Sequence, residues 1–303
     1  YEKLGAFDLS CGLLRRYSVF PDTNIALSLE QNGRWISAQK ILEKAQIKAK
    51  NGSIPFVEDE YSMWENHWET CAKKLQQWDL LMEVSKVDQN PALALDCEWV
   101  LNDWSRSETK SHIESLLSQS KEESRQKKLM ECFLTLNQLK DSAEKMTIFQ
   151  SSMEALYQDS IIAWAHLPSS ATNAHCMALE QIQVLIELQE SASFFANVTN
   201  SMNRPQFLQD LKALLSTWRD RLPNTWEDTG TWSDLLAWRQ HVFTAINSVF
   251  HNGAVAANPT NDPAASNGSG STGNSNSHPF AYRGYHETAW LINRFAHVAR
   301  KNE

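Results

Sequence analysis

The chain has 303 residues, of which 42% are hydrophobic and twelve are Trp, and its formal net charge at pH 7 is −8. A chain of this length and apolar content buries a sizeable core, which excludes a disordered protein. No apolar run reaches the roughly 20 residues that a membrane-spanning helix needs, so a membrane protein is excluded as well. Lys and Arg are scattered among Asp and Glu, which gives direct binding to nucleic acid little support.

Cysteine usage and the two ends of the chain indicate its setting. The cysteines are odd in number, widely spaced and without a C-x-x-C pair; they are Cys11, Cys71, Cys97, Cys132 and Cys176. This pattern predicts reduced core thiols in a protein of the cytoplasm or nucleus, with no disulfides. Both ends resemble helical segments and no signal peptide is visible, so we interpret the chain as a fragment of a much larger one.

The first clear helix is expected at residues 33–45, with the sequence GRWISAQKILEKA. Ala38, Ile41, Leu42 and Ala45 fall on one helical face, and their alternation of small and large side chains is typical of a tetratricopeptide-like helix. No strict repeat of roughly 34 residues follows, so we expect any repeats to be degenerate.

Farther along the chain, apolar residues recur at steps of three and four, which is the period of an amphipathic helix. Four stripes show this best: Tyr61, Trp64, Trp68, Cys71 and Leu75; Met146, Phe149, Met153, Leu156 and Trp164; Leu179, Ile182, Leu185, Ile186 and Gln189; and Phe207, Leu211, Leu214, Leu215 and Trp218. No run of alternating β-branched residues indicates a strand, so the predicted fold class is all-α.

Helix-breaking residues separate the stripes. They are Asn51-Gly52 with Pro55, Asn90-Pro91, Leu167-Pro168-Ser169, Arg204-Pro205 and Leu222-Pro223-Asn224. Capping-box spacings at Ser105 and Glu108, Ser120 and Glu123, and Thr231 and Asp234 predict helix starts. Because short connections favour antiparallel packing, these helices predict a helical-hairpin solenoid of the tetratricopeptide or HEAT type.

One segment departs from the helical pattern. Residues 251–279 are rich in Asn, Ser, Gly, Pro and Ala, and they contain too little apolar surface to offset the entropy of ordering. We expect a disordered polar insertion here, between helical repeats at residues 1–250 and their continuation at residues 280–303. The helical pattern resumes from Tyr285 to Arg300.

No motif for chemistry stands out, because the sequence lacks the phosphate-binding loop, the dinucleotide fingerprint, the zinc-protease and nucleophile-elbow motifs and the kinase set. His175-Cys176 is the nearest to a reactive pair, but adjacent helical residues point apart, and a helix start explains it better. We therefore predict no enzyme and no catalytic, cofactor-binding or metal-binding residue, expect no cofactor, and leave the partner-binding residues unknown.

Three other features have a functional and a structural interpretation. Glu58, Asp59 and Glu60 resemble a metal cluster, yet acidic residues in a first helical turn also complement the helix dipole, so a solvated helix start is expected. The mixed-charge run Lys121–Lys128 is expected to be a solvated face. Aromatic residues dominate binding hot spots, but core packing is favoured for those on or beside the apolar stripes: Trp35, Trp64, Trp68, Trp78, Trp99 and Trp104.

Several sequence blocks occur in a recognisable order. They are Leu95-Asp96-Cys97-Glu98-Trp99 with Trp104; Ile186-Glu187-Leu188-Gln189-Glu190-Ser191-Ala192; Trp218-Arg219-Asp220-Arg221-Leu222-Pro223 followed by Trp232 and Trp238-Arg239-Gln240-His241; and Ala296-His297-Val298-Ala299-Arg300-Lys301. Together they resemble the FAT domain of the TRRAP family, the large pseudokinase members of the phosphatidylinositol-3-kinase-related kinases. The polar insertion and the first fifty or so residues depart from that pattern.

The resemblance implies a helical FAT domain that wraps a kinase-like domain farther toward the C-terminus. It further implies a nuclear, noncatalytic scaffold in histone acetyltransferase complexes such as SAGA, with their other subunits, transcription activators and its own pseudokinase domain as partners. The family offers no ligand motif within these blocks, so no site residue is carried over. Two alternatives stay open: the regulatory FAT domain of an active kinase of the same superfamily, and an unrelated tetratricopeptide-type adaptor that binds peptides.

Overall fold

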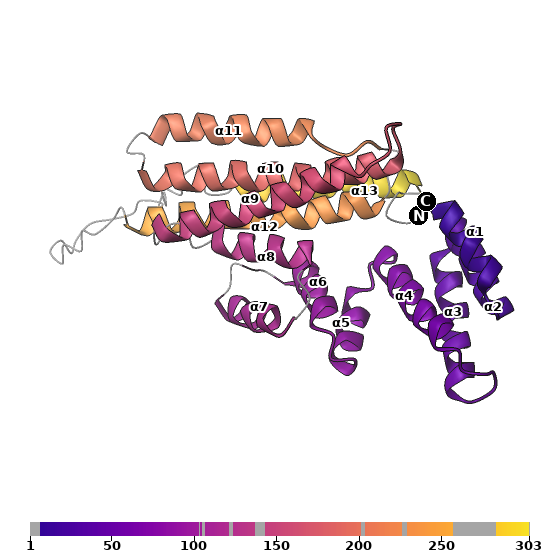
Figure 1. Cartoon of the computed structure of the whole chain (residues 1–303). Coiled ribbons are helices and arrows are strands. Elements are labelled where there is room, and N and C mark those ends of the chain that lie inside the picture. The colour runs from indigo at the N-terminus through magenta and orange to yellow at the C-terminus, as the bar shows by residue number, and fades with distance from the viewer. Residues whose placement is uncertain are drawn as a thin grey trace, which may run out of the picture. The chain divides into compact units, whose positions relative to one another are not determined.

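The structure, a computed structural model, describes residues 7–102, 104, 107–120, 124–136, 143–200, 204–225, 229–256 and 283–302. These residues form thirteen α-helices and no strand, which confirms the predicted all-α class (Figure 1). The helices are α1 (Phe7–Tyr17), α2 (Pro21–Gln31), α3 (Trp35–Lys50), α4 (Glu58–Lys74), α5 (Trp78–Val87), α6 (Pro91–Leu101), α7 (Ser107–Gln119), α8 (Arg125–Leu136), α9 (Ala143–Ala165), α10 (Asn173–Asn200), α11 (Arg204–Asp220), α12 (Thr229–Ala256) and α13 (Arg283–Asn302).

The chain divides into two compact units. The first unit comprises Tyr1–Asn102, Ser111–Glu131 and Ser152–Leu185, and the second comprises Asp103–Lys110, Cys132–Ser151 and Ile186–Glu303. Helices α1 to α6 therefore belong entirely to the first unit and α11 to α13 entirely to the second, while α7 to α10 contribute to both.

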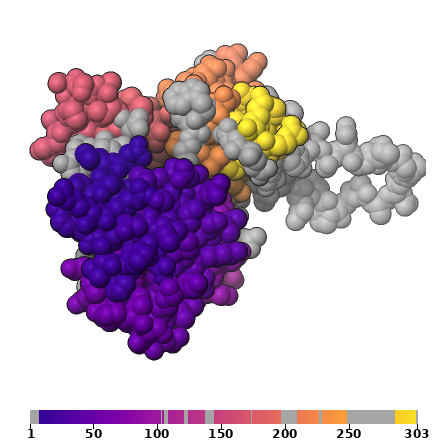
Figure 2. All heavy atoms as spheres, turned by 90° about the vertical axis from the view of Figure 1, so that its right-hand side faces the viewer, coloured from indigo at the N-terminus to yellow at the C-terminus, as the bar shows by residue number. Residues whose placement is uncertain are grey.

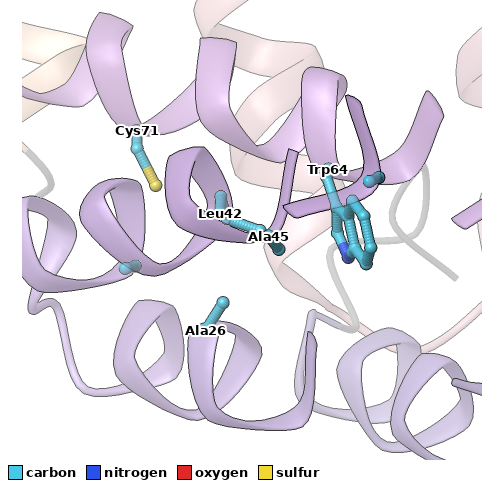
Figure 3. Packing of buried hydrophobic residues seen from close by; sticks show 7 residues of the cluster. Ala26, Leu42, Ala45, Trp64 and Cys71 are labelled. Carbon is cyan, nitrogen blue, oxygen red and sulfur yellow. The ribbon is translucent and has the colours of Figure 1, made fainter. Parts of the chain in front are cut away.

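In the first unit, α2, α3 and α4 pack against one another as successive helical hairpins (Figure 1). Their shared core consists of Ala26, Ala38, Leu42, Ala45, Ala49, Trp64 and Cys71 (Figure 3). Small alanine side chains let the helix backbones approach closely, and the Trp64 ring fills the space that remains. The predicted face of residues 33–45 is confirmed, because Ala38, Leu42 and Ala45 are buried and Ile41 packs against the cluster.

Four helices of the first unit end in the same hydrogen-bonded turn. The amides of Arg34, Ser53, Gln77 and Asn90 each donate to a carbonyl five residues earlier, which is the Schellman arrangement. The residue before each donor has a positive φ: Gly33 (68°), Gly52 (70°), Gln76 (56°) and Gln89 (51°). Glycine adopts this conformation readily and glutamine does not, so the last two turns are strained, and no residue type in the sequence signals their positive φ.

The predicted helix breaks at residues 51–55, 167–169 and 222–224 fall between helices, whereas Asn90-Pro91 and Arg204-Pro205 mark helix starts, because Pro91 is the first residue of α6 and Arg204 the first of α11. Asn90 caps α6 by accepting from the amides of Ala92 and Leu93. Two predicted capping boxes are wrong: Thr231 lies inside α12, and α8 is capped by Ser124, whose hydroxyl accepts from the Lys127 amide. Ser105 of the third box lies outside the described residues.

In the second unit, the long helices α10, α11 and α12 run side by side, and α13 packs against α12 (Figure 1). Large rings fill this core, among them Trp218, Trp232 and Trp238. Predicted stripe residues Leu211, Leu215 and Trp218 are buried on α11. One side of α13 is turned inward, and the rest of it lies on the molecular surface (Figure 2).

The predicted stripe of α10 is confirmed at Leu185, which is buried, but is wrong at other positions. Leu179 and Ile186 are 53% and 39% exposed, whereas Glu187, Leu188 and Ala192 are buried. A hydrophobic-period argument places a carboxylate outside, and it fails here because a partner neutralises Glu187, as described below. The last position of the α9 stripe is also wrong, since Trp164 is 41% exposed.

The predicted polar insertion is described only at its edges. Helix α12 continues to Ala256, beyond the expected start of the insertion at residue 251, and residues 257–282 lie outside the described residues. Helix α13 follows, where the helical pattern was expected to resume. The insertion itself stays a prediction.

The five cysteines are free, as predicted. Cys71, Cys97 and Cys132 are buried, whereas Cys11 is half-buried and Cys176 is exposed, so three of them are core thiols. Among the helices in the described ranges, none has the length and apolarity that crossing a bilayer requires.

Candidate functional site: an arginine–glutamate cluster

The second unit contains a fully buried ion pair between Glu187 of α10 and Arg239 of α12. Arg239 Nε donates to Glu187 Oε2 at 3.1 Å and Arg239 Nη2 donates to Glu187 Oε1 at 2.7 Å. The two side chains are 2% and 0% exposed. A guanidinium can hold both carboxylate oxygens only in one plane, so this pair fixes the position of α12 along α10.

A second pair lies three residues farther along α10. Arg221, which follows α11, donates from Nη1 and Nη2 to the two oxygens of Glu190, each at 2.9 Å. The indole nitrogen of Trp218 also donates to Glu190 Oε2 at 2.8 Å. The hydrogen bond to Glu190 raises the pKa of Arg221 above its ordinary value, against the effect of its partial burial. This pair ties the end of α11 to α10.

A third pair joins α11 to α13. Arg219 donates from Nε and Nη2 to the two oxygens of Glu287, each at 2.8 Å, and Glu287 is buried. The Arg219 guanidinium lies over the Trp290 ring at 4.7 Å from its centroid, and the Arg239 guanidinium lies 5.6 Å from the centroid of Trp218. We call these side chains the arginine–glutamate cluster: Glu187, Glu190, Trp218, Arg219, Arg221, Arg239, Glu287 and Trp290.

An aromatic group from the same unit includes the neighbour of Arg239. The Phe133 centroid lies 5.6 Å from that of Trp238 and 5.9 Å from that of Trp104. The His241 ring packs between them, 5.7 Å from both Trp104 and Phe133. These ring contacts, edge-to-face where Phe133 meets Trp104 and Trp238, connect α8, α12 and Trp104, which lies between α6 and α7.

The arginine–glutamate cluster has a structural role, in which its ion pairs hold helices in position. Each of its three carboxylates has both oxygens bound by one guanidinium, so these groups hold helices rather than a metal ion or a proton in transfer. No group of three or more His, Cys, Asp or Glu side chains in the described part of the chain could hold a metal ion. The geometry therefore points to mechanical coupling of α10, α11, α12 and α13.

The acidic residues at the start of α4 do not form the uniformly solvated helix start that was predicted. Glu58 and Asp59 are exposed, but Glu60 is buried. Its carboxylate accepts from the Val19 amide at 2.9 Å, the Phe20 amide at 3.1 Å and the Thr23 hydroxyl. Phe20 is the N-cap of α2, Val19 precedes it and Thr23 lies in the first turn, and the N-cap makes no side-chain hydrogen bond of its own. Glu60 therefore caps α2 from a helix about forty residues away.

The predicted helix start at His175 is confirmed. His175 accepts at Nδ1 from the Thr172 amide at 3.1 Å, just before the first residue of α10, and its ring packs edge-on against Trp164. Cys176 is exposed. The two adjacent side chains therefore have different surroundings, and the structure does not bring them together as a reactive pair.

The mixed-charge run Lys121–Lys128 and the singled-out tryptophans are the remaining candidate residues. In the described part of Lys121–Lys128, Arg125 donates to Ser160 and Lys128 pairs with Asp159, so the prediction of a purely solvated face is wrong. Burial lowers the pKa of Arg125. Core packing of the singled-out tryptophans is confirmed for Trp64, Trp99 and Trp104, which are buried; Trp35, Trp68 and Trp78 are half-buried against the same cores.

Five of the six charged residues of the arginine–glutamate cluster come from the sequence blocks singled out above. Glu187 and Glu190 come from one block, Arg219 and Arg221 from the next, and Arg239 from the one after. The first block lies in α6, where Asp96 accepts from Lys73 of α4 at 3.0 Å. Burial works against the charge of Lys73, but Asp96 and Glu69 raise its pKa overall. Three of the four blocks therefore contain a charged residue that binds a residue of another helix.

Comparison with known proteins defines the class. A family model of the FAT domain matches residues 91–303, which include every residue of the arginine–glutamate cluster. The chain belongs to the FAT domain family.

Particular relatives confirm the resemblance to the TRRAP family. The chain is 38% identical over its whole length to the SAGA complex/NuA4 acetyltransferase complex subunit TRA1 of Saccharomyces cerevisiae. It is 39% identical to the corresponding Tra1 subunit of Schizosaccharomyces pombe, again over 100% of the chain. It is 30% identical over 99% of the chain to the human transformation/transcription domain-associated protein. The chain spans only 8% of the length of each of these three relatives.

Sequence reasoning found these blocks but missed their pairing. It did not identify Glu187, Glu190, Arg239 or Glu287 as partners, because the members of each pair lie 31 to 68 residues apart. One local signal was available in the sequence. Glu187 stands between Ile186 and Leu188, and a carboxylate among apolar residues needs a partner of opposite charge if it is buried.

Proposed function

We propose that this segment is a noncatalytic scaffold in a TRRAP-like coactivator subunit of a nuclear histone acetyltransferase complex of the SAGA type. In this role the helices support a pseudokinase domain farther along the same polypeptide and contribute to the recruitment of transcription activators. The observation that carries the proposal is the 38% identity, over the whole chain, to a subunit named for the SAGA and NuA4 acetyltransferase complexes.

The geometry is consistent with a scaffold because the strongest polar contacts connect helices. Three two-pronged ion pairs couple four long helices, and each has at least one member that is buried or partly buried. Such pairs contribute little net stability compared with apolar packing, but they define one relative position of the helices. A scaffold that holds large neighbouring domains needs its helices to keep one fixed relative position.

The first test is to tag the natural full-length protein, purify it gently and assay the eluate for histone acetyltransferase and protein kinase activity in parallel. The proposal predicts acetyltransferase activity, from copurified subunits, without kinase activity. Intrinsic kinase activity would instead support the FAT domain of an active kinase, with this segment as its regulator. An eluate free of acetyltransferase subunits would overturn the proposal.

A second test connects the cluster to assembly. The variant Arg239→Met removes the buried cation in the full-length protein, and Arg16→Met is the control, since Arg16 is exposed on α1. We expect the first variant to copurify with less acetyltransferase activity per molecule and the control to be unchanged. Equal activity in the two eluates would contradict the assignment of a supporting role to the cluster.

A further inference from the structure

The first turn of α10 is closed by a histidine at a position where capping boxes usually have a Glu or Gln. Thr172 directly precedes α10, and His175 is the third residue of the helix. The Thr172 amide donates to His175 Nδ1 at 3.1 Å, and the His175 amide donates to the Thr172 carbonyl oxygen at 3.0 Å. In the usual box, a Glu or Gln side chain accepts from the amide of the residue before the helix.

This contact defines the protonation state of the His175 ring. A backbone amide only donates, so Nδ1 has a free lone pair and the ring is the neutral tautomer with its proton on Nε2. An imidazolium has a hydrogen on both nitrogens, and its Nδ1 would direct a donor at the Thr172 amide. It would also place a positive charge in the first turn of α10, where the helix dipole disfavours it. Only the neutral ring therefore closes this turn.

A second histidine between the same two helices makes the opposite contact. His166 follows α9, and its Nδ1 lies 2.6 Å from the Ile162 carbonyl oxygen. A carbonyl oxygen only accepts, so here Nδ1 donates, and it donates in the neutral and the protonated ring alike. A positive charge at the C-terminal end of α9 also complements the helix dipole. We call the segment from Ile162 to His175 the α9–α10 corner; a proton preserves its first histidine contact and breaks its second.

Other charged or titratable groups belong to the helices that meet at this corner. They are His166 and Asp159 at the end of α9, Arg125 and Lys128 on α8, and Cys176 and Glu180 on α10. Asp159 is paired with Lys128 at 2.9 Å, and Arg125 donates to the carbonyl oxygen of Gln181. Within the described ranges, none of these groups forms an ion pair with His175, so no carboxylate supports its protonated form.

The Trp164 ring favours the protonated form, but by too little. The centroids of His175 and Trp164 lie 5.3 Å apart, with the rings perpendicular. A partly exposed contact between a cation and an indole is worth about two- to fivefold in an equilibrium constant. The lost capping contact and the charge in the first turn together are worth about ten- to thirtyfold. About fivefold remains against the closed turn when His175 is protonated.

We propose that the α9–α10 corner is a proton-sensitive device in which protonation of His175 opens the first turn of α10. The stabilisation is present at high pH, where the ring is neutral. It is lost as the pH falls through the range of about 8 to 5 in which an imidazole changes its charge. Apolar side chains at and beside the corner are already exposed, among them Ile162 and Met177, so opening the turn enlarges an apolar surface. The inference is independent of the proposed function, because it concerns one corner of the first unit.

The test is hydrogen exchange of the full-length protein at about pH 8 and about pH 5.5, measured by mass spectrometry on peptides that contain Thr172 to Leu179. Each rate is divided by that of the same peptide when unfolded at the same pH, which removes the intrinsic pH dependence of exchange. His175→Gln keeps an acceptor oxygen that does not titrate, and His175→Glu completes the usual capping box. His166→Gln is the matched control, because it removes the other titrating ring of the same corner.

We expect the corrected exchange of the natural protein to be about fivefold faster at the lower pH. The difference should vanish in both His175 variants and persist in His166→Gln. His175→Glu should also exchange more slowly than the natural protein at the lower pH, which shows that this variant is folded. Equal corrected rates at the two pH values in the natural protein overturn the proposal. So does a pH difference that persists in His175→Gln or disappears in His166→Gln.

Discussion

The two units hold antiparallel helices together in different ways. In α2, α3 and α4 the contact surface consists mainly of alanines, and the connecting turns are closed by backbone hydrogen bonds. In α10 to α13 the helices are longer, tryptophans fill the core, and charged pairs bind one helix to the next.

The difference shows how helix length changes what fixes register. Short helices joined by tight turns have little freedom to slide, so close packing of small residues is sufficient. Long helices such as α10 and α12 can shift by a turn and still bury apolar surface. Ion pairs that bind both carboxylate oxygens remove that freedom, because a shift leaves buried charges without partners.

The largest effect should come from breaking the buried pair of the second unit. Arg239→Met leaves Glu187 buried without its cation, which should destabilise the α10–α12 contact by about 3–5 kcal/mol. Hydrogen exchange of peptides from α10 and α12 in the full-length protein measures the loss as faster exchange. The double variant Arg239→Met/Glu187→Met should recover most of the protection. If the single variant exchanges as slowly as the natural protein, the pair does not hold the helices.

In the first unit, the corresponding test is to insert a larger side chain into the alanine contact between α2, α3 and α4. Ala38→Leu adds volume where α3 contacts its neighbours with no exposed surface, so we expect a loss of about 1–3 kcal/mol. Lys40→Leu, two residues along on the exposed side of α3, is the matched control. Hydrogen exchange across α2 to α4 distinguishes them, and similar exchange in both variants would show that the alanine contact is loosely packed.

Glu60 is an exception in the first unit, since it is a buried charge that joins two helices. Glu60→Gln removes the negative charge at the start of α2 and replaces one acceptor oxygen by a donor, at an expected cost of about 1–2 kcal/mol. Glu58→Gln on the exposed side of the same helical turn should have no measurable effect. Exchange rates of the α2 amides report the difference. Equal rates in the two variants would mean that water caps α2 as well as Glu60 does.

A smaller effect, of opposite signs, is expected at the turns. Gln89→Gly relieves an unfavourable positive φ and should stabilise the α5–α6 turn by about 0.5 kcal/mol, whereas Gly33→Gln should destabilise the α2–α3 turn by about 1 kcal/mol. A Cβ added at Gly33 meets no atom within 4 Å, so the second change tests backbone conformation alone. Hydrogen exchange of the amides around each turn in the full-length protein measures both changes in stability. If both variants were stabilised, or both destabilised, the argument from a strained positive φ would be contradicted.

These turns also show how far the sequence could take the prediction. Breaks marked by Pro or Gly, such as Asn90-Pro91, were predicted correctly because those residues restrict the backbone locally. The turn at Gln76 was missed, and so was the positive φ of Gln89 just before Asn90-Pro91, since glutamine carries no signal for a left-handed backbone. The sequence identified the family blocks in the same way, from local residue order. It could not show that Arg239 binds Glu187, which lies 52 residues away and on another helix.

The smallest expected effect is a difference in reactivity between the buried and the exposed cysteine thiols. Burial raises the pKa of Cys97 to about 11 and also raises that of Cys71, which further lies beside Glu30. At pH 8 both thiols should resist iodoacetamide, while exposed Cys176 should be alkylated first, as peptide mass spectrometry would show.

The raised pKa of Cys97 also predicts how the free energy of unfolding changes with pH. The contribution of Cys97 is complete below pH 9 and is lost as the pH rises through about 11, because the thiol ionises at lower pH in the unfolded chain than in the folded one. Rapid alkylation of Cys97 at pH 8 in the folded protein would show that the α5–α6 hairpin opens readily. In that case the close packing of short helices would be a weaker constraint than the ion pairs that hold the long ones.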